Sequence, residues 1–308
     1  MGVAVVFPGQ GSQFAGMARP WTAHPAGRVV LEEASEAMDR DVVAGCDDED
    51  ALRTTAFTQP ALLACGVAAF RVLDAEGLDT SGLVGAAGHS LGEFAAVVAA
   101  GALTFREAMQ VVVVRGREME RAGEQRPGTM SALLGIGTDR ASELCDRARG
   151  DDVLLVANQN SPAQVVISGS IAAIERAEAL AAEERIRAVR LNVAGAFHSP
   201  LMEPAVEPIV AALDDAEIRA PRFPIAENAS GALVSDPADL RELLGRQVVS
   251  PVLWERDVHA LAAAGASTFL EAGPGNVLTK MAKRLVPDAI AVAADSPDAA
   301  TAAVSSAP

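Results

Sequence analysis

Residues 83–100 read LVGAAGHSLGEFAAVVAA, which is an apolar run, a turn with two glycines, and a second apolar run. The first run, Leu83–Ala87, has the length and composition of a buried strand, and Glu93–Ala100 is typical of a helix. Between them, GHSLG fits the G-x-S-x-G nucleophile elbow, in which glycines let the strand and the helix approach closely around a strained serine. We therefore expect an α/β protein with Ser90 as a nucleophile. The alternative is a strand–helix turn whose serine only caps the helix.

Two other segments follow the same plan of an apolar strand and a glycine-rich turn. Val3–Phe7 precedes the turn PGQG, and Thr268–Glu271 precedes the turn AGPG. Short apolar strands that alternate with helices indicate a parallel sheet covered on both faces, and ligands bind such sheets at the carboxyl ends of the strands. Because all three turns follow strands, we expect them to converge on one site.

Over residues 127–195 the order of predicted strands and helices differs from that of the flanking sequence, which predicts a separate small subdomain. The expected order is strand, helix, strand, strand, helix, strand, at Met130–Ile136, Asp139–Arg149, Val153–Ala157, Gln164–Ser168, Ile171–Glu184 and Arg187–Val193. This β-α-β-β-α-β order is that of a ferredoxin-like unit. We expect it to be inserted into a large α/β subdomain formed by residues 1–126 and 196–294. The tail, 295–308, is rich in Ala, Ser, Asp and Pro and is expected to be disordered.

The composition excludes several classes of protein. With 308 residues, of which 50% are hydrophobic, the chain can bury a large core. Its 25 basic and 41 acidic residues give a net charge of −16, which argues against binding to nucleic acid or to an anionic membrane surface. The longest apolar stretches, taken as 94–103 and 108–114, fall short of the roughly 18 residues that span a bilayer. Three cysteines without paired spacing predict neither a disulfide framework nor a metal site, which fits a cytoplasmic protein.

A serine nucleophile needs a base, and histidine is the side chain whose pKa suits proton transfer near neutral pH. Of the four histidines, His24 lies in a segment next to proline and His259 lies on an amphipathic helix, so a solvated role is expected for both. His89 adjoins Ser90, and its side chain should point away from the nucleophile to pack or form hydrogen bonds. His198 follows the last strand of the small subdomain, at a junction where a cleft is expected, and is our candidate for the base.

One arginine stands out because it is surrounded by apolar residues. Arg115 follows four valines and precedes Gly116. A buried arginine is costly unless it is paired, and its planar guanidinium pairs best with a carboxylate. The sequence leaves two interpretations open: a binding residue for a substrate carboxylate, or a structural arginine that either snorkels to the surface or forms an internal salt bridge.

Eight short motifs, in order along the chain, resemble those of the malonyl-CoA:acyl-carrier-protein transacylase family, which includes discrete polyketide-synthase acyltransferases. They are FPGQGSQ at 7–13, TQPAL at 58–62, GHSLGE at 88–93, VRG at 114–116, NSP at 160–162, GAFHSPLM at 195–202, the segment 247–254, and EAGPG at 271–275. The family implies a hydrolase-like parallel-sheet core with an inserted ferredoxin-like small subdomain. The sequence departs from the family at Phe94, where Tyr or Ile is common, and at Ser199, where Thr or Cys is common. Neither is expected to touch the chemistry.

The resemblance implies catalytic roles for several residues, position by position. Ser90 resembles the acylated nucleophile, and His198 resembles its general base, in a pair without an acidic third member. The backbone N–H groups of Gln10 and Leu91 look like the oxyanion hole.

Further residues resemble the parts of the family that hold the substrate. Arg115, supported by Gln59, resembles the clamp on the free carboxylate. Asn160 and Gln247 match positions near the catalytic histidine, whose ring the Gln247 carbonyl orients. Phe197 resembles the malonyl-type signature, since its bulk would crowd a branched acyl chain.

The activity that the resemblance implies is transfer of a malonyl or related dicarboxylic acyl group from CoA to the phosphopantetheine thiol of an acyl carrier protein, in fatty-acid or polyketide biosynthesis. Malonyl-CoA and the carrier protein would be the partners. No metal, other cofactor, nucleic acid or membrane is expected, and the chain is expected to be a monomer. Alternatives are an acyltransferase for a branched extender such as methylmalonyl or ethylmalonyl, and a serine hydrolase or proofreading thioesterase. A non-enzymatic binding module would not need Ser90.

An acidic carrier protein would need a local basic patch on this acidic chain. Two clusters are candidates: Lys280, Lys283 and Arg284 on the last predicted helix, and Arg185, Arg187 and Arg190 on the small subdomain. Each could equally be an ordinary solvated face.

Overall fold

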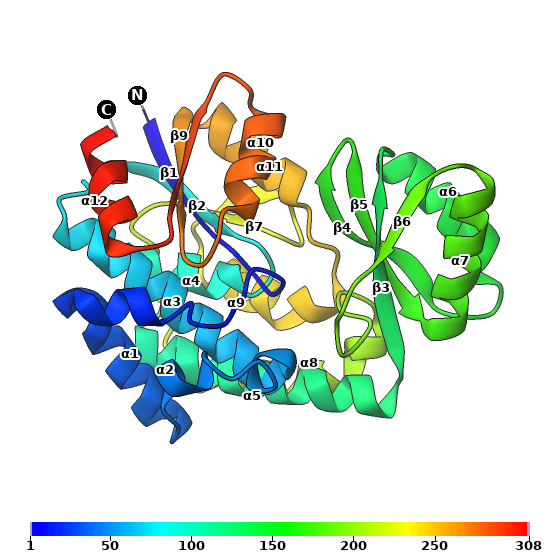
Figure 1. The fold of residues 1–308 in the computed structure, drawn as a ribbon, viewed down its shortest axis with the longest axis horizontal. Helices are drawn as coiled ribbons and strands as arrows, with labels where there is room; N and C mark the ends of the chain where they lie inside the picture. The colour runs from blue at the N-terminus through cyan, green and yellow to red at the C-terminus, as the bar shows by residue number, and fades with distance from the viewer. Residues whose placement is uncertain (1, 307–308) are drawn as a thin grey trace.

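The computed structural model describes residues 2–306 and contains two α/β units side by side (Figure 1). The larger unit is built on a six-stranded sheet in the order β10-β9-β1-β2-β7-β8. Its strands are β1 Gly2–Phe7, β2 Leu83–Gly88, β7 Ile225–Glu227, β8 Ala232–Val234, β9 Ala266–Ala272 and β10 Ile290–Ala294. The first five strands in the sheet order are parallel, and β8 pairs with β7 in the antiparallel direction. The expected α/β class with a mainly parallel sheet is confirmed.

Helices surround this sheet. They are α1 Pro25–Met38, α2 Val42–Gly45, α3 Thr55–Ala75, α4 Gly92–Ala99, α5 Phe105–Gln125, α8 Val206–Asp214, α9 Pro237–Arg246, α10 Trp254–Ala263, α11 Val277–Leu285 and α12 Pro297–Ser306. Short 3-10 helices lie in the connections at η1 Arg19–Ala23, η2 Ala51–Arg53, η3 Pro200–Ala205 and η4 Gln247–Val249.

The two faces of the sheet bury different hydrophobic clusters. Along β1, Val3, Val5 and Phe7 join one cluster, whereas Ala4 and Val6 join the other. The separation follows from the pleat, which directs alternate side chains to opposite faces. Residues of α1, α3, α4 and α5 complete the first cluster, and residues of α10 and α11 complete the second. Both faces are therefore covered, as a parallel sheet requires.

Helix α3 is the one helix within residues 2–306 that is long and apolar enough to cross a membrane by length and composition. The sequence analysis overlooked this stretch, in which threonine, glutamine, proline, cysteine and glycine interrupt the apolar residues. In the structure 89% of its 18-residue apolar window is buried, because the helix packs against α1, α5 and β9. Such burial is typical of the core helix of a globular protein.

The smaller unit, on the right of Figure 1, has an antiparallel sheet in the order β4-β5-β3-β6. Its elements follow the chain as β3 Gly128–Leu134, α6 Thr138–Arg149, β4 Leu154–Ser161, β5 Gln164–Ser170, α7 Ile171–Glu183 and β6 Arg187–Arg190. This is the expected order of strands and helices. One face of the sheet packs against α6 and α7, and the other carries Met130, Ala132 and Val166 into the core that the two units share.

The two units are also joined by backbone hydrogen bonds. The N–H of Gln159, on β4, donates to the carbonyl of Val252 at 2.8 Å, and the Val252 N–H donates to the carbonyl of Ala157 at 2.8 Å. Val252 lies two residues before the start of α10. The next residue, Leu253, donates its N–H to the carbonyl of Asn228 just after β7, so the small sheet is anchored to the larger unit near the carboxyl ends of its parallel strands.

The glycine-rich turns after β1, β2 and β9 meet at that edge of the large sheet. The N–H of His89 donates to the carbonyl of Phe7 at 2.9 Å, which joins the first two turns. Gly273, after β9, packs against the ring of Pro8. The expected convergence is therefore confirmed.

The end of the chain differs from the expectation of disorder over 295–308. Pro297–Ser306 forms helix α12, which packs against α3 and β10 and buries Ala300 and Ala303 completely. Alanine has the highest helix propensity, and two alanines three residues apart share one face, so a segment poor in large apolar residues still forms a packed helix. The expectation of disorder was wrong for this segment, while residues 307 and 308 lie outside the described residues.

Candidate active site

Ser90 lies on the turn between β2 and α4, where close contacts require glycine. A Cβ at Gly92 would lie 2.1 Å from the carbonyl oxygen of Phe7, and a Cβ at Gly88 would lie 1.9 Å from the carbonyl carbon of Gly92. Ser90 has a φ of +52°, in the left-handed region that costs a non-glycine residue conformational energy. The predicted strand, strained turn and helix are therefore all present.

The hydroxyl of Ser90 contacts His198. Its Oγ lies 2.7 Å from Nε2 of the imidazole. His198 is only 3% exposed and belongs to the segment that returns from the small unit. The structure thus brings together the two residues that the sequence analysis paired from distant parts of the chain.

The other ring nitrogen fixes the protonation of His198. Nδ1 lies 3.0 Å from the carbonyl oxygens of both Gln247 and Ser250, and carbonyls only accept hydrogen bonds. Nδ1 therefore carries the proton, and Nε2 is free to accept the hydroxyl proton of Ser90. Burial, helped by the charge of Arg115, lowers the pKa of His198 to about 3. The imidazole is accordingly neutral at neutral pH, as a proton acceptor must be.

Arg115, on α5, lies directly beside the same hydroxyl. Its Nη2 donates to Ser90 Oγ at 3.1 Å, and the side chain is only 1% exposed. No carboxylate within residues 2–306 forms an ion pair with it, and its Nε has no hydrogen-bond partner there. Burial lowers the pKa of Arg115 to about 10, so the guanidinium stays charged at neutral pH. The internal salt bridge of the structural interpretation is therefore not observed.

Two amide side chains hold the guanidinium in place. Nη1 of Arg115 donates to Oε1 of Gln59 at 2.5 Å, and Nη2 donates to Oε1 of Gln247 at 2.7 Å. The ring of Phe94 lies 5.7 Å from the guanidinium carbon. Phe94 therefore contacts the site, contrary to the expectation from sequence. Ser199, the other departure from the family, donates to the carbonyl of Ala196 at 2.6 Å and has a structural role.

The backbone N–H groups of Gln10 and Leu91 border the same space. Gln10 follows β1, and Leu91 follows Ser90 at the beginning of α4. Neither N–H donates to an acceptor in the part of the chain that the structure describes. Two unoccupied donors beside a reactive hydroxyl form the kind of site that stabilises negative charge on a reacting oxygen.

His89 turns away from Ser90, as expected, and joins the small unit. Its Nε2 lies 2.9 Å from Oδ1 of Asn160, on β4, and its ring lies 5.6 Å from that of Trp254. Burial lowers the pKa of His89. Asn160 thus contacts the histidine of the elbow, and its link to His198 is indirect.

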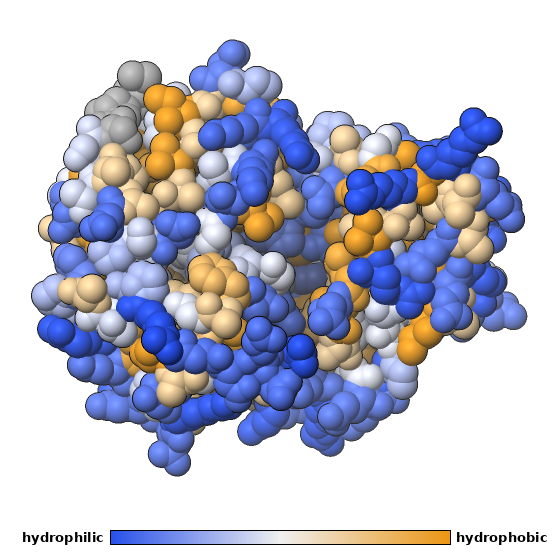
Figure 2. All heavy atoms as spheres, viewed as in Figure 1, coloured by the Kyte–Doolittle hydropathy of each residue, from blue (hydrophilic) through white to orange (hydrophobic). Residues whose placement is uncertain are grey.

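A cavity of about 220 Å³ lies between the two units at the edge where the turns converge. Figure 2 shows the surface hollowed between the larger unit and the smaller one. The polar residues of its wall are Gln10, Ser12, Gln59, His89, Ser90, Asn158, Asn160, Gln164 and His198. The larger apolar residues are Leu91, Met119, Met130, Val166, Leu191, Val193, Phe197, Val277, Leu278 and Met281. Arg115 lies behind this wall, next to Ser90 and Gln59.

The remaining histidines lie elsewhere. His24 accepts a hydrogen bond from the N–H of Ala26 at 3.2 Å at the beginning of α1, and the His259 side chain is 51% exposed on α10. Within residues 2–306 no three side chains of His, Cys, Asp or Glu form a group that could hold a metal ion.

Asn228 is a residue of the site that the sequence analysis missed. It immediately follows β7, and its Oδ1 accepts a hydrogen bond from the N–H of Ser90 at 2.7 Å. Its position after a strand was the available signal, because polar residues at the carboxyl ends of parallel strands face the ligand site. The three residues of β7 are too few to stand out in the sequence.

Comparisons with known proteins point to one family. The family model described as "Acyl transferase domain" matches residues 4–303. The malonyl CoA-acyl carrier protein transacylase of Bacillus subtilis (strain 168) is 38% identical over 288 residues, which cover 92% of this chain and 90% of the relative.

Solved structures agree with the sequence matches. The malonyl CoA-acyl carrier protein transacylase from Coxiella burnetii has a TM-score of 0.95 at 34% identity, covering 99% of this chain and 97% of that one. A malonyl-transacylase solved in complex with a type II PKS acyl-carrier protein also has a TM-score of 0.95 at 34% identity, with all of both chains covered.

Proposed function

The chain belongs to the acyl transferase domain family, and from this premise we propose that it transfers a malonyl group from CoA to an acyl carrier protein through an acyl-serine intermediate. The observation that carries the proposal is the position of one hydroxyl. Ser90 Oγ lies within hydrogen-bond distance of both the neutral Nε2 of His198 and the charged Nη2 of Arg115. A base and a carboxylate-binding group thus meet at one nucleophile.

In the first half-reaction, Ser90 Oγ attacks the thioester carbonyl carbon of malonyl-CoA while its proton passes to Nε2 of His198. The imidazolium that forms is stabilised at Nδ1–H by the carbonyls of Gln247 and Ser250. The carbonyl oxygen becomes an oxyanion, which the N–H groups of Gln10 and Leu91 stabilise. Collapse of the intermediate breaks the carbon–sulfur bond, and His198 returns the proton to the CoA thiolate.

In the second half-reaction, the phosphopantetheine thiol of the carrier protein attacks the malonyl ester. His198 accepts the thiol proton and then protonates Ser90 Oγ as the ester bond breaks. The chain thereby returns to its starting state in a double-displacement cycle. Neither half-reaction requires a metal or a redox cofactor, because the chain supplies the proton acceptor and the oxyanion donors.

Arg115 selects acyl groups that carry a free carboxylate. Its buried charge has only neutral partners, and a carboxylate matches the two parallel N–H bonds of a guanidinium. Binding the carboxylate replaces the contact of Nη2 with Ser90, which leaves the hydroxyl to His198 alone. Gln59 and Gln247 keep the guanidinium oriented during this exchange.

Phe197 restricts the acyl group to malonyl in preference to branched extenders such as methylmalonyl or ethylmalonyl. Its ring lines the cavity beside His198 and is only 6% exposed. A substituent on the α-carbon of the acyl group would have to occupy the space of this ring.

We extend the proposal to the organisation of the chain and to its partners. The described residues of 1–126 and 196–294, with helix α12 packed on them, form a hydrolase-like subdomain, and residues 127–195 form a ferredoxin-like one. The protein acts as a cytoplasmic monomer without membrane or nucleic acid. The names of the relatives support malonyl-CoA and acyl carrier protein as substrates in fatty-acid biosynthesis, and the complex with a type II PKS carrier extends this to polyketide biosynthesis. The comparisons do not favour a serine hydrolase or proofreading thioesterase.

The test is intact-mass measurement after incubation with a panel of acyl-CoA thioesters. Malonyl-CoA should add the mass of one malonyl group, and Ser90→Ala should abolish the gain. Addition of a phosphopantetheinylated carrier protein should then move that mass to the carrier. Loading without transfer, with release of free malonate, would overturn the proposal in favour of a hydrolase.

A further inference from the structure

The side chain of Asn228 lies against the turn between β2 and α4 and contacts the backbone of this turn on both sides of His89. Its Oδ1 accepts from the N–H of Ser90 at 2.7 Å, and its Nδ2 donates to the carbonyl of Gly88 at 2.8 Å. The side chain is fully buried. Ser90 precedes the first residue of α4 and follows the last residue of β2, so neither a helix nor a sheet supplies a partner for its N–H. The side-chain amide of Asn228 supplies that partner instead.

Asp257, on α10, supports the direction of this amide, which the Ser90 N–H and the Gly88 carbonyl already require. Its Oδ2 accepts the second N–H of Asn228 Nδ2 at 3.0 Å. Both hydrogens of the amide nitrogen are then used on acceptors, which leaves Oδ1 as the only group that can face the Ser90 N–H. A flipped amide would place its oxygen against the Gly88 carbonyl, which only accepts, and its hydrogens against the Ser90 N–H, which only donates. Asp257 is itself fully buried and therefore cannot be replaced by water without rearrangement.

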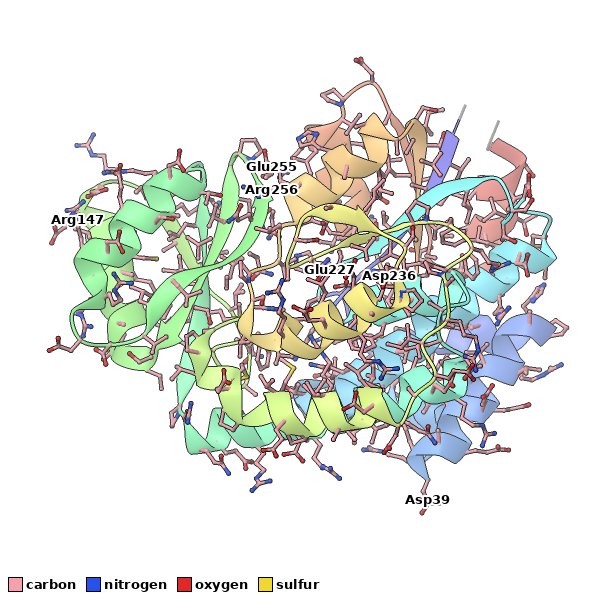
Figure 3. All side chains as sticks on the ribbon, turned by 180° about the vertical axis from the view of Figure 1, so that it is seen from behind. Asp39, Arg147, Glu227, Asp236, Glu255 and Arg256 are labelled. Carbon is pink, nitrogen blue, oxygen red and sulfur yellow. The ribbon has the colours of Figure 1, made fainter. Side chains whose placement is uncertain are left out.

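The loop that carries Asn228 is fixed at both ends. The carboxylate of Glu227 accepts from the N–H groups of Ala229 and Ser230 at 2.9 Å and 2.8 Å. The carbonyl of Asn228 accepts from the N–H of Leu253, just before α10, at 2.8 Å. Seen from behind in Figure 3, Glu227 lies within the body of the large unit, whereas Asp39 projects at the outline of the large unit and Arg147 at that of the small unit.

The same view places Glu255 and Arg256, at the beginning of α10, beside the smaller unit (Figure 3). Helix α10 thus contributes Asp257 to the elbow from the region where the two units meet. A chain of two hydrogen bonds runs from Asp257 on this helix through Asn228 to the reacting serine.

We propose that Asn228 is a positioning residue for Ser90, and that Asp257 acts through it by supporting the orientation of its amide. The proposal rests on the proposed function for its kinetic readout. Ser90 is held in a strained, left-handed conformation. Without the two hydrogen bonds by which Asn228 links the Ser90 N–H to the Gly88 carbonyl, the backbone of the turn would relax toward an unstrained conformation. Ser90 Oγ would then no longer lie between Nε2 of His198 and the carbonyl carbon of the thioester that it attacks.

The first test replaces Asn228. Asn228→Ala should lower kcat of malonyl loading by about 100-fold, with KM nearly unchanged, because a misplacement of about 1 Å costs that much. Asn228→Asp should lose as much, since it removes both donors and sets an oxygen against the Gly88 carbonyl and Asp257. Val258→Ala, on the neighbouring residue of α10, is the control: it removes buried core contacts, and should lower the melting temperature while leaving kcat unchanged. Wild-type kcat in folded Asn228→Ala would overturn the proposal.

The second test separates positioning from folding and does not need Asn228 to be changed. Asp257→Asn keeps an acceptor oxygen for the Asn228 amide, so it should retain most of the activity that Asp257→Leu loses. Equal losses in the two variants would overturn the role of Asp257. If Asn228→Ala does not fold, this pair alone decides the matter.

A readout independent of the acyl substrate keeps this inference apart from the proposed function. The rate at which a fluorophosphonate labels Ser90 reports on the reactivity of the hydroxyl whatever its natural substrate. It should fall in Asn228→Ala and Asp257→Leu and stay near wild type in Asp257→Asn. If the wild-type protein does not load malonyl-CoA but shows this pattern, the proposed function fails and the positioning role stands. Unchanged labelling in Asn228→Ala would overturn the positioning role.

Discussion

Ser90 and His198 are both held in the left-handed backbone region, at φ values of +52° and +56°, with Oγ and Nε2 2.7 Å apart. Within residues 2–306, only Asp39 and Arg185 share this conformation among the residues other than glycine. Each strained residue carries a conformational cost of order 1–3 kcal/mol, which the surrounding contacts must offset. For Ser90 the contacts are those of the elbow and Asn228, and for His198 they are the two carbonyls at Nδ1. The strain is concentrated where two distant segments must present reacting atoms to each other.

The burial of His198 makes the stability of the protein depend on pH. Its folded-state pKa is lowered from 6.5 to about 3, so between these values the unfolded chain binds more protons than the folded one. Stability therefore rises with pH through this window and falls as the pH drops from about 6.5, by an amount on the order of a few kcal/mol. His198→Gln should remove this contribution, so its melting temperature should fall less than that of wild type between pH 7 and pH 4.

The control for this prediction is His259→Gln, because His259 is half-exposed on α10 and lies outside the cavity. Its melting curve should follow that of wild type. Parallel pH dependence in wild type and His198→Gln would contradict the assignment.

Arg115→Ala should abolish the preference of the enzyme for acyl groups that carry a free carboxylate, such as malonyl, over those that do not, such as acetyl. Removing one partner of a buried charge pair costs about 2–5 kcal/mol, so kcat/KM for malonyl-CoA should fall by roughly 30- to 5,000-fold. Loading of acetyl-CoA should be retained or should rise, because the acetyl group has no carboxylate to bind. Intact-mass measurement of loading with the two thioesters checks this, with Arg117→Ala, two residues further along α5 and exposed, as the control. Equal loss of both activities would show that Arg115 is needed for the nucleophile rather than for the carboxylate.

Phe197→Ala should relax the preference for an unbranched acyl group. One methyl group is worth about 1–3 kcal/mol in a pocket, so the ratio of kcat/KM for methylmalonyl-CoA over malonyl-CoA should rise by about tenfold or more. Met130→Ala enlarges the same cavity from the sheet of the small unit and should not shift that ratio comparably. An unchanged ratio in Phe197→Ala would place the branch-excluding wall elsewhere.

Gly92→Ala should prevent the elbow from forming. The added Cβ would lie 2.1 Å from the carbonyl oxygen of Phe7, which belongs to the central strand and cannot move away. We expect a loss of several kcal/mol in the free energy of unfolding, or failure to fold, measured by urea denaturation. Gly137→Ala is the control, because φ is −92° there and the nearest neighbour, the Pro162 carbonyl oxygen, is 3.3 Å away. Similar denaturation midpoints for Gly92→Ala and wild type would contradict the close approach.

Much of this fold was predictable because the deciding residues are local. The strands β1, β2 and β9 are apolar runs next to glycine-rich turns, and the last predicted helix, which carries Lys280, Lys283 and Arg284, is α11, Val277–Leu285. Local patterns of this kind depend on the period of the secondary structure, which a sequence displays directly. Helix α12 was not predicted, because its few buried alanines do not form a recognisable apolar pattern and are buried only by packing against α3.

The residues of the site likewise fall into those that the sequence predicts and those that it does not. Ser90 was predicted from its own motif, and His198 from its place at the junction of the two units. Asn228 and Asp257 were not found, because neither belongs to a recognisable motif or to a predicted junction of the two units. Their partnership depends on β7 lying next to β2 in the sheet, a pairing that short strands leave unspecified in the sequence.

Helix α11 combines one wall of the cavity with a basic surface, which makes it the better of the two candidate docking sites for an acidic carrier protein. Val277, Leu278 and Met281 line the cavity, while Lys280 and Lys283 of the same helix form no ion pair in the described part of the chain. In the alternative cluster, by contrast, Arg190 is already bound by the carboxylate of Glu178 through two hydrogen bonds, at 2.7 Å and 2.6 Å.

Unpaired cations on α11 attract an acidic partner, whereas an arginine already paired with a carboxylate does so weakly. The double reversal Lys280→Glu and Lys283→Glu should therefore raise KM for the carrier protein by roughly tenfold and make it less sensitive to salt. The matched reversal Arg185→Glu and Arg187→Glu should have a smaller effect, because no residue of the segment 185–190 lines the cavity. Loading from malonyl-CoA, measured without a carrier, is the control for folding and for the CoA phosphates. If both reactions weaken equally, the lysines serve CoA and the docking assignment fails; if only the arginine pair matters, the carrier binds the small unit instead.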